Sequence, residues 1–306
     1  MNKRVKRQLE KLCDGAVLFD EPLARWTSLK VGGPADALVM PRSLNALGQI
    51  LAFARQEGVP YFVIGRGTNL IVNDRGFHGV VISLKMGFKK MTVTDPKDRP
   101  TVLVTVEGGV YLSQLVKFTA KAGFSGLEFA AGIPGSAGGA ISMNAGSWGG
   151  EIKDCLQEIS VLDEEGKVRR WERSRLSFGY RTLLVPKGDI ILSGTFCLGR
   201  SNPGQVQDMV TSNLARKRTT QPLRQPSAGS IFKNPAGIAA GKLIEMAGLK
   251  GMRSGGAVVS RKHANFIVNT GGATASDILG LLGLVRDQVQ ARFGVKLEPE
   301  VEIIGA

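Results

Sequence analysis

Histidine and cysteine are scarce in this sequence. Of 306 residues, two are histidine (His78 and His263) and three are cysteine. The histidines fall in different predicted domains, so a Ser-His-Asp triad is hard to build, and a histidine-based metal site has too few ligands. Cys13, Cys155 and Cys197 contain no CxxC pair, which argues against a disulfide framework and a zinc site. We therefore expect no metal, and chemistry supplied by other side chains or by a cofactor.

Long apolar runs and aromatic side chains are also few. No apolar run approaches the roughly 18 residues of a membrane-spanning helix. The basic N-terminus, residues 1–15, lacks the apolar core of a signal peptide. Together with the cysteine usage, these absences predict a soluble, cytoplasmic protein without a membrane span.

Positive charge is what the sequence has in excess. Forty Lys and Arg residues against 26 Asp and Glu leave a net charge of +14. Such a charge favours nucleic acid or anionic small molecules as partners. Nucleic-acid surfaces pair basic stripes with stacking aromatics, whereas aromatic residues make up only 6% of this chain and its basic clusters are scattered. We favour a phosphate-bearing ligand and expect no nucleic acid.

Hydrophobic periodicity predicts an α/β protein long enough for two or three domains. One helix is expected from Ser43 to about Gly58 and a second from Leu112 to a stop at Gly123. A third should end near Arg218 and a fourth should span 239–247. A final helix should begin after a capping box formed by Thr274 and Asp277. Strands are expected at 61–64, 71–72, 80–83, 190–198, 265–269 and 300–304, with His78 in a surface turn, a polar turn at 95–100 before a strand to 107, and a hairpin of 159–163 with 168–171.

The stretch 130–146, AAGIPGSAGGAISMNAG, constrains the chemistry most tightly. Its glycines cost conformational entropy, so they need a reason. One reason is a loop whose backbone approaches an anionic ligand, and the other is a mobile linker. Linkers favour polar residues, whereas Ile133, Ile141 and Met143 interrupt the glycines here. We favour the ligand loop.

A second glycine loop, GRGTN at 65–69, follows a predicted strand. Its glycines could bring amides to a pyrophosphate, but a tight turn between strands explains them equally well. It is not the Rossmann fingerprint, because Leu70 stands where that motif needs glycine, and the GK[ST] of a P-loop is missing. Two loops that match neither motif point to a dinucleotide held in another way.

Three further residues have functional and structural interpretations. Ser230 lies near Lys233 and could deliver a proton, although serine more often caps a turn. Arg181 lies between aromatic and aliphatic residues, so a partly buried guanidinium there needs a carboxylate partner from protein or substrate. Glu300 enters the last strand and could equally be a charge at a sheet edge. Spacing alone does not join the three.

Seven motifs in register resemble the bacterial UDP-N-acetylenolpyruvoylglucosamine reductases, the MurB family. They are TSLKVGGPAD, IGRGTNLIV, GLEFAAGIPGSAGGAISMNAGSWGGEI, FGYRTLL, PSAGSIFKNP, GLKGMRSGGAVVSRKHANFIVN and LEPEVEIIG, and they cover nearly everything from Thr27 to Gly305. The unbroken run from Tyr180 to Leu184 resembles the shorter subtype, which lacks an extra tyrosine-bearing loop.

The resemblance implies the α/β FAD-binding fold of the vanillyl-alcohol-oxidase (PCMH) type. It implies FAD-binding subdomains at 1–85 and 86–202 and a C-terminal substrate-binding domain at 203–306, whose last strand may pack back on the first subdomain. The FAD, held non-covalently, would be bound by Gly65, Arg66, Gly67, Thr68, Asn69, Gly132, Ile133, Pro134, Gly135, Ser136, Gly138, Gly139 and Asn144. Arg66 departs from the more usual glycine.

The resemblance also implies the reaction. The enzyme would make UDP-N-acetylmuramate for peptidoglycan by reducing the enolpyruvyl group of UDP-N-acetylglucosamine enolpyruvate, with NADPH as co-substrate, hydride from FAD N5 and a proton from Ser230. Arg181 would stabilise the developing enolate, and Glu300 would orient Arg181 or the substrate. Substrate contacts would come from Tyr180, Lys233, Asn234, Lys250, Lys262 and His263. We expect a monomer. A flavin oxidase of the same fold and a non-enzymatic nucleotide-sugar or nucleic-acid binder are the competing hypotheses.

Overall fold

The computed structural model describes residues 1–95 and 98–305. By its internal contacts the chain divides into two compact units, each made of separate segments. Unit 1 comprises residues 1–19, 37–65 and 79–216, and unit 2 comprises residues 20–36, 66–78 and 217–306. The sequence-based prediction instead divides the chain into three continuous domains with boundaries at residues 85 and 202. That division stays a prediction.

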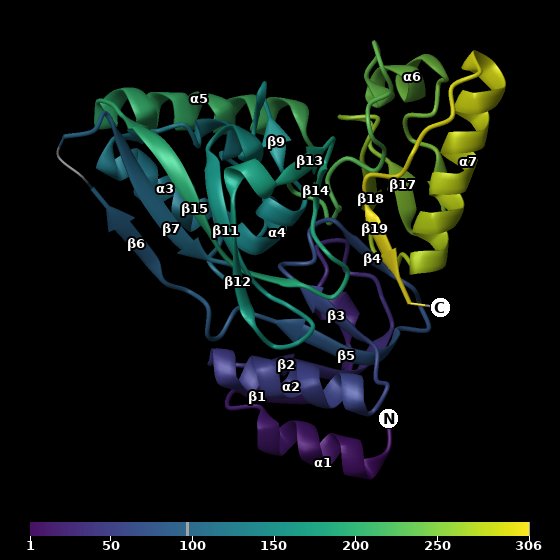
Figure 1. Ribbon diagram of the computed structural model, residues 1–306. Helices are drawn as coiled ribbons and strands as arrows, with labels where there is room; N and C mark the ends of the chain where they lie inside the picture. Colours follow the sequence, from purple (N-terminus) through teal and green to yellow (C-terminus); the bar gives the residue numbers. More distant parts are fainter. Residues whose placement is uncertain (96–97, 306) are drawn as a thin grey trace. The chain divides into compact units, whose positions relative to one another are not determined.

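Unit 1 holds two cores, each formed by one sheet and its helices. One sheet has the order β1-β2-β5-β3, and the other has the order β12-β11-β15-β7-β6 with β8 beside β15. Helices α1 and α2 lie side by side (Figure 1). The helices are α1 (Lys3–Leu12), α2 (Leu44–Gln56), α3 (Leu112–Ala122), α4 (Ala137–Ser142) and α5 (Pro203–Thr220), the last of which runs on into unit 2.

The strands of these sheets are short and mostly antiparallel. Strands β3 and β5 pair in parallel, with Tyr61 opposite Val80. The strands are β1 (Ala16–Pro22), β2 (Pro34–Met40), β3 (Tyr61–Ile64), β5 (Phe77–Ser83), β6 (Met91–Thr94), β7 (Thr101–Glu107), β8 (Phe124–Ser125), β11 (Leu156–Leu162), β12 (Val168–Glu172) and β15 (Ile190–Arg200), with the small hairpins β9 (Gly146–Ser147)–β10 (Gly150–Glu151) and β13 (Ser177–Gly179)–β14 (Thr182–Leu184).

Local chemistry explains the helix ends that the sequence predicts. The Ser43 hydroxyl accepts a hydrogen bond from the Ala46 amide at 3.2 Å and starts α2. Gly123 adopts the left-handed conformation, φ +73°, and ends α3. The strand predicted up to residue 107 is also confirmed as β7, whose side chains alternate between buried and half-buried. Residues 96–97 of the predicted turn lie outside the described residues.

Unit 2 packs two helices against a small sheet around one apolar core. Helix α7 contacts both β16 and β17 (Figure 1). The predicted capping box is confirmed: the Thr274 hydroxyl accepts from the Asp277 amide, and the Asp277 carboxylate accepts from the Thr274 amide. The elements are α6 (Ala240–Met246), α7 (Ala275–Phe293), the three-stranded sheet β16 (Arg253–Ser254), β17 (Ala257–Val259) and β18 (Ile267–Asn269), and the parallel pair β4 (Leu70–Val72) and β19 (Glu302–Ile304).

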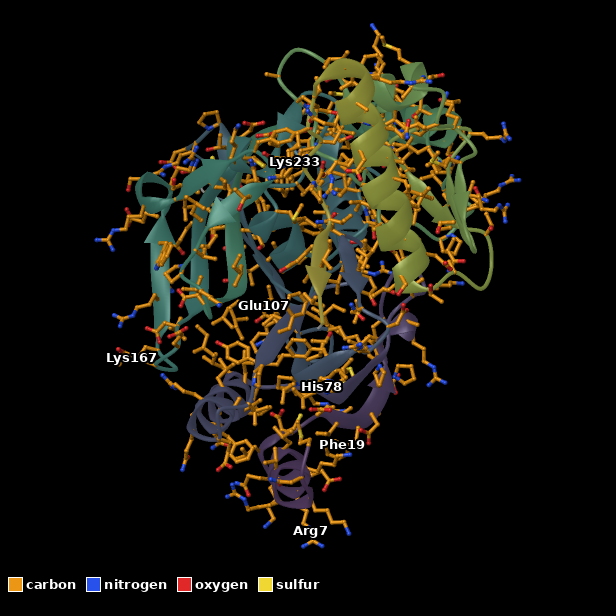
Figure 2. The ribbon with its side chains drawn as sticks, turned by 90° about the vertical axis from the view of Figure 1, so that its right-hand side faces the viewer. Arg7, Phe19, His78, Glu107, Lys167 and Lys233 are labelled. Carbon is orange, nitrogen blue, oxygen red and sulfur yellow. The ribbon has the colours of Figure 1, made fainter. Side chains whose placement is uncertain are left out.

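Two predicted strand starts and one predicted turn differ from the structure. The strand predicted from Asn265 begins at Ile267, because the amide of Phe266 closes a turn onto the carbonyl of His263. The strand predicted from Glu300 begins at Glu302, because the Glu300 amide donates to Ile231. His78, labelled in Figure 2, is exposed as predicted, but it lies in β5 and not in a turn. Its Nδ1 is 3.7 Å from Oδ1 of Asp36.

The N-terminal helix α1 has no counterpart in the sequence predictions. Its Val5 and Leu9 are buried against the unit 1 core, while Arg7 points outward (Figure 2). All three cysteines are free. No helix among the described residues is long and apolar enough to cross a membrane.

The N-terminus of α7 depends on a residue about 200 positions earlier, Asp74. Its carboxylate accepts hydrogen bonds from the Ala275 amide at 2.7 Å, the Ser276 amide at 2.9 Å and the Ser276 hydroxyl at 2.6 Å. Burial raises the pKa of Asp74, but these hydrogen bonds outweigh it and hold the pKa below its ordinary value. The ionised carboxylate therefore stabilises the helix start.

We predict that Asp74→Ala lowers the free energy of unfolding by about 1 kcal/mol, because it removes a partly exposed helix cap. Because the fold lowers the pKa of Asp74, its ionised carboxylate stabilises the folded state fully at pH values above the ordinary carboxyl pKa of about 4. This stabilisation is lost as the pH falls through the lowered pKa. Urea unfolding should therefore separate Asp74→Ala from the wild type at neutral pH and bring them together in acid. Asp287→Asn, which affects only an exposed pair with Arg286, serves as the control. An Asp74→Ala variant as stable as this control would contradict the prediction.

Candidate functional site

Within unit 1 the two glycine-rich segments meet. Ser136 caps α4 by accepting from the Gly139 amide at 3.3 Å. A Cβ placed on Gly65, the residue after β3, would lie 2.7 Å from the Ser136 hydroxyl oxygen. Gly138 approaches the backbone of Gly108, to whose carbonyl it donates at 3.0 Å. The glycines are therefore needed for close approach to other protein atoms, which fits an ordered, tightly packed loop and not a mobile linker.

The predicted FAD-binding residues divide between the units. Gly65, residues 132–139 and Asn144 belong to unit 1, and residues 66–69 belong to unit 2. Exposed backbone at Gly65, Gly132 and Pro134 is compatible with contact to a bound dinucleotide. Asn144 differs from the others because it is fully buried, and its side chain bonds Glu151, the Gly179 carbonyl and the Lys153 amide.

In unit 2 the amide of Asn265 holds the segment that carries Ser230. This buried side chain accepts from the Phe232 amide at 3.0 Å and donates to the Phe232 carbonyl at 2.8 Å, while the Asn265 carbonyl accepts from Ile231. The side-chain amide of Asn265 thus makes the two hydrogen bonds to Phe232 that the backbone of a neighbouring strand would make in a sheet. The half-buried Ser230 follows Gly229, whose φ of +77° bends the chain just before it.

The segment that carries Glu300 lies directly beside the segment of Ser230. The Glu300 amide donates to the Ile231 carbonyl at 2.8 Å, and the Lys233 amide donates to the Glu298 carbonyl at 2.9 Å. On its other side, the Glu300 carbonyl accepts from the Asn69 side chain at 3.0 Å. The segments of Ser230 and Glu300, which spacing alone did not join, are therefore connected by hydrogen bonds in unit 2, and Asn69 is bonded to the same assembly.

Arg181 lies in unit 1, in the turn between β13 and β14. Its φ is +56°, its side chain is 19% exposed, and its Nη1 lies 3.8 Å from Oε1 of Glu151. The predicted carboxylate partner is therefore present in the protein. Burial raises the pKa of Glu151, but hydrogen bonds from Lys153 and Asn144 and the charges of Lys153 and Arg181 outweigh it and lower the pKa, so Glu151 is ionised at neutral pH.

Four of the predicted substrate-binding residues have partners within their own unit. Lys233, labelled in Figure 2, lies 3.7 Å from Glu298, and Lys250 forms an ion pair with Glu245. The Asn234 side chain accepts from the Ala240 amide and starts α6. Tyr180 is 44% exposed, and the guanidinium of Arg181 lies over its ring at 5.1 Å.

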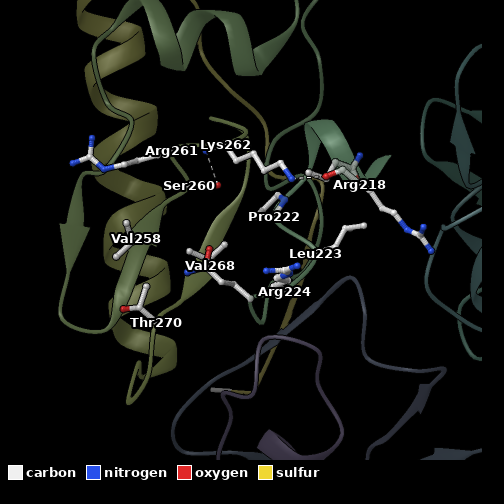
Figure 3. Close-up of a pocket in the computed structure, with 12 residues that line it drawn as sticks. Arg218, Pro222, Leu223, Arg224, Val258, Ser260, Arg261, Lys262, Val268 and Thr270 are labelled. Atoms are coloured by element: carbon white, nitrogen blue, oxygen red, sulfur yellow. Dashed lines mark hydrogen bonds between the residues drawn. The ribbon is translucent and has the colours of Figure 1, made fainter. Parts of the chain in front are cut away.

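Lys262 lines a pocket of about 980 Å³ in unit 2 (Figure 3). Four of the twelve described lining residues are cationic and none is acidic, so the pocket suits a polyanion. The cations are Arg218, Arg224, Arg261 and Lys262, whose ammonium group donates to the Arg218 carbonyl.

His263, next to Lys262 in the chain, is buried enough to be neutral. Burial lowers its pKa, and the charge of Lys250 lowers it further. Its ring lies edge-on to Phe266, and Nδ1 has no hydrogen-bond partner among the described residues.

Two residues important to this arrangement were missed by the sequence analysis. Asn265 was counted only as part of a strand, although an amide inside the run ANFIVN is a visible polar interruption. Glu151 gave no signal as the partner of Arg181, because 30 positions separate them. Both act through hydrogen bonds that only the folded chain reveals.

Comparison with known proteins first defines the class. The sequence model of the FAD binding domain family matches residues 35–172. This range includes both glycine-rich segments and Asn144. With the close-packed glycines, this match defines an FAD-binding flavoprotein and confirms the predicted α/β FAD-binding fold.

The particular family follows from the rest of the chain. Residues 221–304 match the model of the UDP-N-acetylenolpyruvoylglucosamine reductase C-terminal domain. UDP-N-acetylenolpyruvoylglucosamine reductases of Syntrophus aciditrophicus and Clostridioides difficile are 44% and 42% identical, over 98% and 94% of this chain and 96% and 93% of the relatives. The crystal structure of that reductase from Thermus caldophilus matches with a TM-score of 0.79 and 36% identity, covering 95% of this chain and 99% of that one.

The chain belongs to the UDP-N-acetylenolpyruvoylglucosamine reductase family. It is an FAD-dependent oxidoreductase of peptidoglycan synthesis, as the resemblance implied.

We predict that Gly65→Ala weakens FAD binding by about tenfold, because the new methyl group collides with the Ser136 hydroxyl and separates the two glycine segments. Titration of the apoprotein with FAD, followed by flavin fluorescence, measures the change. Gly48→Ala is the matched control, since Gly48 lies in α2 with no atom within 4 Å of the added Cβ. Equal FAD affinity in the two variants would show that the contact with Ser136 does not support binding.

Proposed function

We propose that this protein reduces the enolpyruvyl group of UDP-N-acetylglucosamine enolpyruvate to the lactyl group of UDP-N-acetylmuramate, with NADPH as co-substrate. We infer the substrate from the names of the relatives, which are UDP-N-acetylenolpyruvoylglucosamine reductases. The observation that supports the residue assignment is the pairing of the Ser230 and Glu300 segments through the hydrogen bond between Glu300 and Ile231. A cytoplasmic location, inferred from the cysteine usage, and a monomeric state complete the proposal.

Residues 65–69 and 132–139, with Ser136, are proposed to hold the FAD pyrophosphate. Their glycines let the two segments pack closely against neighbouring protein atoms, and main-chain amides in such glycine-rich loops can bind an anion. When bound, the flavin would supply the hydride that NADPH delivers to it, a chemistry that no side chain of the protein can perform. The protein supplies position, charge and a proton.

Arg181 is proposed to stabilise the negative charge that develops on the substrate during reduction. Hydride addition to the methylene carbon of the enolpyruvyl group leaves charge on the adjacent carbon and on its carboxylate. A guanidinium that is 19% exposed acts in a medium less polar than water, where an oriented cation is worth several kcal/mol of barrier. Its planar donors also match the two oxygens of a carboxylate.

Ser230 is proposed to donate the proton that completes the reduction. The residues that follow Ser230 are hydrogen-bonded to Asn265 on one side and to the Glu300 segment on the other. These bonds hold the backbone that carries the hydroxyl in one place. We assign Glu300 an orienting role, because its backbone is bonded both to the Ser230 segment and to Asn69.

The cationic pocket is proposed to receive the diphosphate end of the substrate. A UDP-sugar carries its charge on the diphosphate, and the four cations of the pocket have no acidic neighbour among its described lining residues. Of the substrate-binding residues predicted from the sequence, Lys262 lines this pocket. Lys233, Asn234, Lys250, His263 and Tyr180 remain proposed contacts for other parts of the substrate.

Ser230→Ala should retain flavin reduction by NADPH and lose flavin reoxidation by the enolpyruvyl sugar, by about 10²- to 10⁴-fold for a lost general acid. Stopped-flow absorbance of the flavin measures the two half-reactions separately. Wild-type protein that is bleached by NADPH and reoxidised by oxygen but not by the sugar would instead indicate a flavin oxidase. A colourless protein that cannot bind added FAD would contradict the whole proposal.

Lys262→Ala should raise KM for the enolpyruvyl substrate about tenfold and leave kcat nearly unchanged, because it removes a charge-assisted contact to the bound diphosphate but none to the reacting carbon. Arg286→Ala, which removes an exposed cation paired only with its neighbour Asp287, is the control. Steady-state kinetics at two salt concentrations should show the KM effect shrinking as salt rises. An effect on kcat alone would place Lys262 outside the diphosphate site.

A further inference from the structure

The guanidinium of Arg181 is held by a small structure on the opposite hairpin, β9–β10. Arg181 has a left-handed backbone conformation, φ +56°, in the turn of the β13–β14 hairpin, whose strands have three residues each. The residue before it, Tyr180, is exposed. A long side chain on such a turn loses considerable rotamer freedom when it is fixed. Something must therefore orient it.

Glu151, the last residue of β10, provides that orientation. Its two carboxylate oxygens have separate partners: Oε2 accepts from Lys153 at 2.6 Å and from Asn144 at 3.1 Å, while Oε1 lies 3.8 Å from Nη1 of Arg181. Asn144 also donates to the carbonyl of Gly179 at 3.3 Å, the end of β13 just before the turn. One buried asparagine thus connects the carboxylate to the turn that carries the arginine.

The contact between Arg181 and Glu151 is electrostatic. At 3.8 Å, Nη1 and Oε1 attract each other without forming a hydrogen bond. This attraction draws the guanidinium toward the Glu151 carboxylate and so favours one direction of the arginine side chain.

Gly146 makes room for the pair. A Cβ at this position would lie 2.8 Å from Nη1 of Arg181 and 2.7 Å from Cγ of Glu151. Gly146 does not have a positive φ, so the reason for glycine here is space and not backbone conformation. On the same hairpin, the ring of Trp148 lies 4.3 Å beneath the guanidinium of Arg216, which anchors the loop to α5.

We propose that Glu151 is the positioning residue for Arg181, holding its guanidinium in the direction that stabilises the enolate, with Gly146 providing the space. This inference rests on the proposed catalytic role of Arg181. Glu151 acts through the arginine, so its loss should affect only the half-reaction in which Arg181 is used.

The test compares Glu151→Gln with wild type in the two half-reactions. The glutamine keeps an oxygen that can accept from Asn144 but removes the charge opposite Arg181. We expect flavin reoxidation by the enolpyruvyl sugar to slow about tenfold to hundredfold, the usual cost of losing an orienting partner, while flavin reduction by NADPH stays unchanged. The thermal unfolding midpoint should fall slightly, because the fold lowers the pKa of Glu151 and neutralising it removes that stabilisation. Glu165→Gln, which removes an exposed carboxylate paired with Lys167, is the matched control and should behave as wild type.

Gly146→Ala gives a second, independent variant should Glu151→Gln fold poorly. Its methyl group would lie 2.7 Å from Cγ of Glu151 and 2.8 Å from Nη1 of Arg181, as well as 2.7 Å from the Gly150 carbonyl oxygen, so the same selective loss of reoxidation is expected. Unchanged reoxidation in either folded variant, or an equal loss in both half-reactions, would overturn the positioning role.

Arg181→Ala separates this inference from the proposal beneath it. If Glu151 acts through Arg181, adding Glu151→Gln to Arg181→Ala should cause no further loss. A double variant that loses the full sum of the two single effects overturns the positioning role alone. An Arg181→Ala variant that reoxidises as fast as wild type overturns the catalytic assignment of Arg181, and the positioning role falls with it.

Discussion

The side-chain amide of Asn265 is the interaction on which the functional half of unit 2 depends. It satisfies both backbone groups of Phe232, which no strand neighbour does, and so fixes the segment that carries Ser230. Through Ile231 that segment holds Glu300, and through Glu300 it reaches Asn69. Four stretches of sequence are therefore ordered by one buried amide. An unpaired amide at this depth would cost 1–3 kcal/mol, by order of magnitude, so the arrangement is formed completely or not at all.

Features that depend on neighbours in sequence could be predicted from the sequence. Ser43, Gly123 and the Thr274–Asp277 pair mark helix ends through contacts within four residues, and all three are confirmed. The chemistry of Arg181 could also be predicted in kind: a buried cation needs a carboxylate. Which carboxylate could not be predicted, because Glu151 reaches it only after two hairpins have formed.

Errors at strand boundaries have the same origin. The predicted starts at Asn265 and Glu300 followed apolar patterning, but both residues are occupied by contacts that replace a ladder. The family resemblance could supply roles for residues that physical patterning left unconnected. It could not supply Asn265 or Glu151, since neither carries reacting chemistry and each matters only through the atoms that it orients.

Unit 2 is assembled from segments at 20–36, 66–78 and 217–306, and this order has a consequence during synthesis. Strand β4 emerges from the ribosome more than 200 residues before β19, with which it pairs. Until the last strand arrives, β4 presents unpaired amides and carbonyls and a wholly apolar sequence, a combination that promotes aggregation. The partly made chain is therefore exposed to aggregation through β4 from the synthesis of that strand until the synthesis of β19.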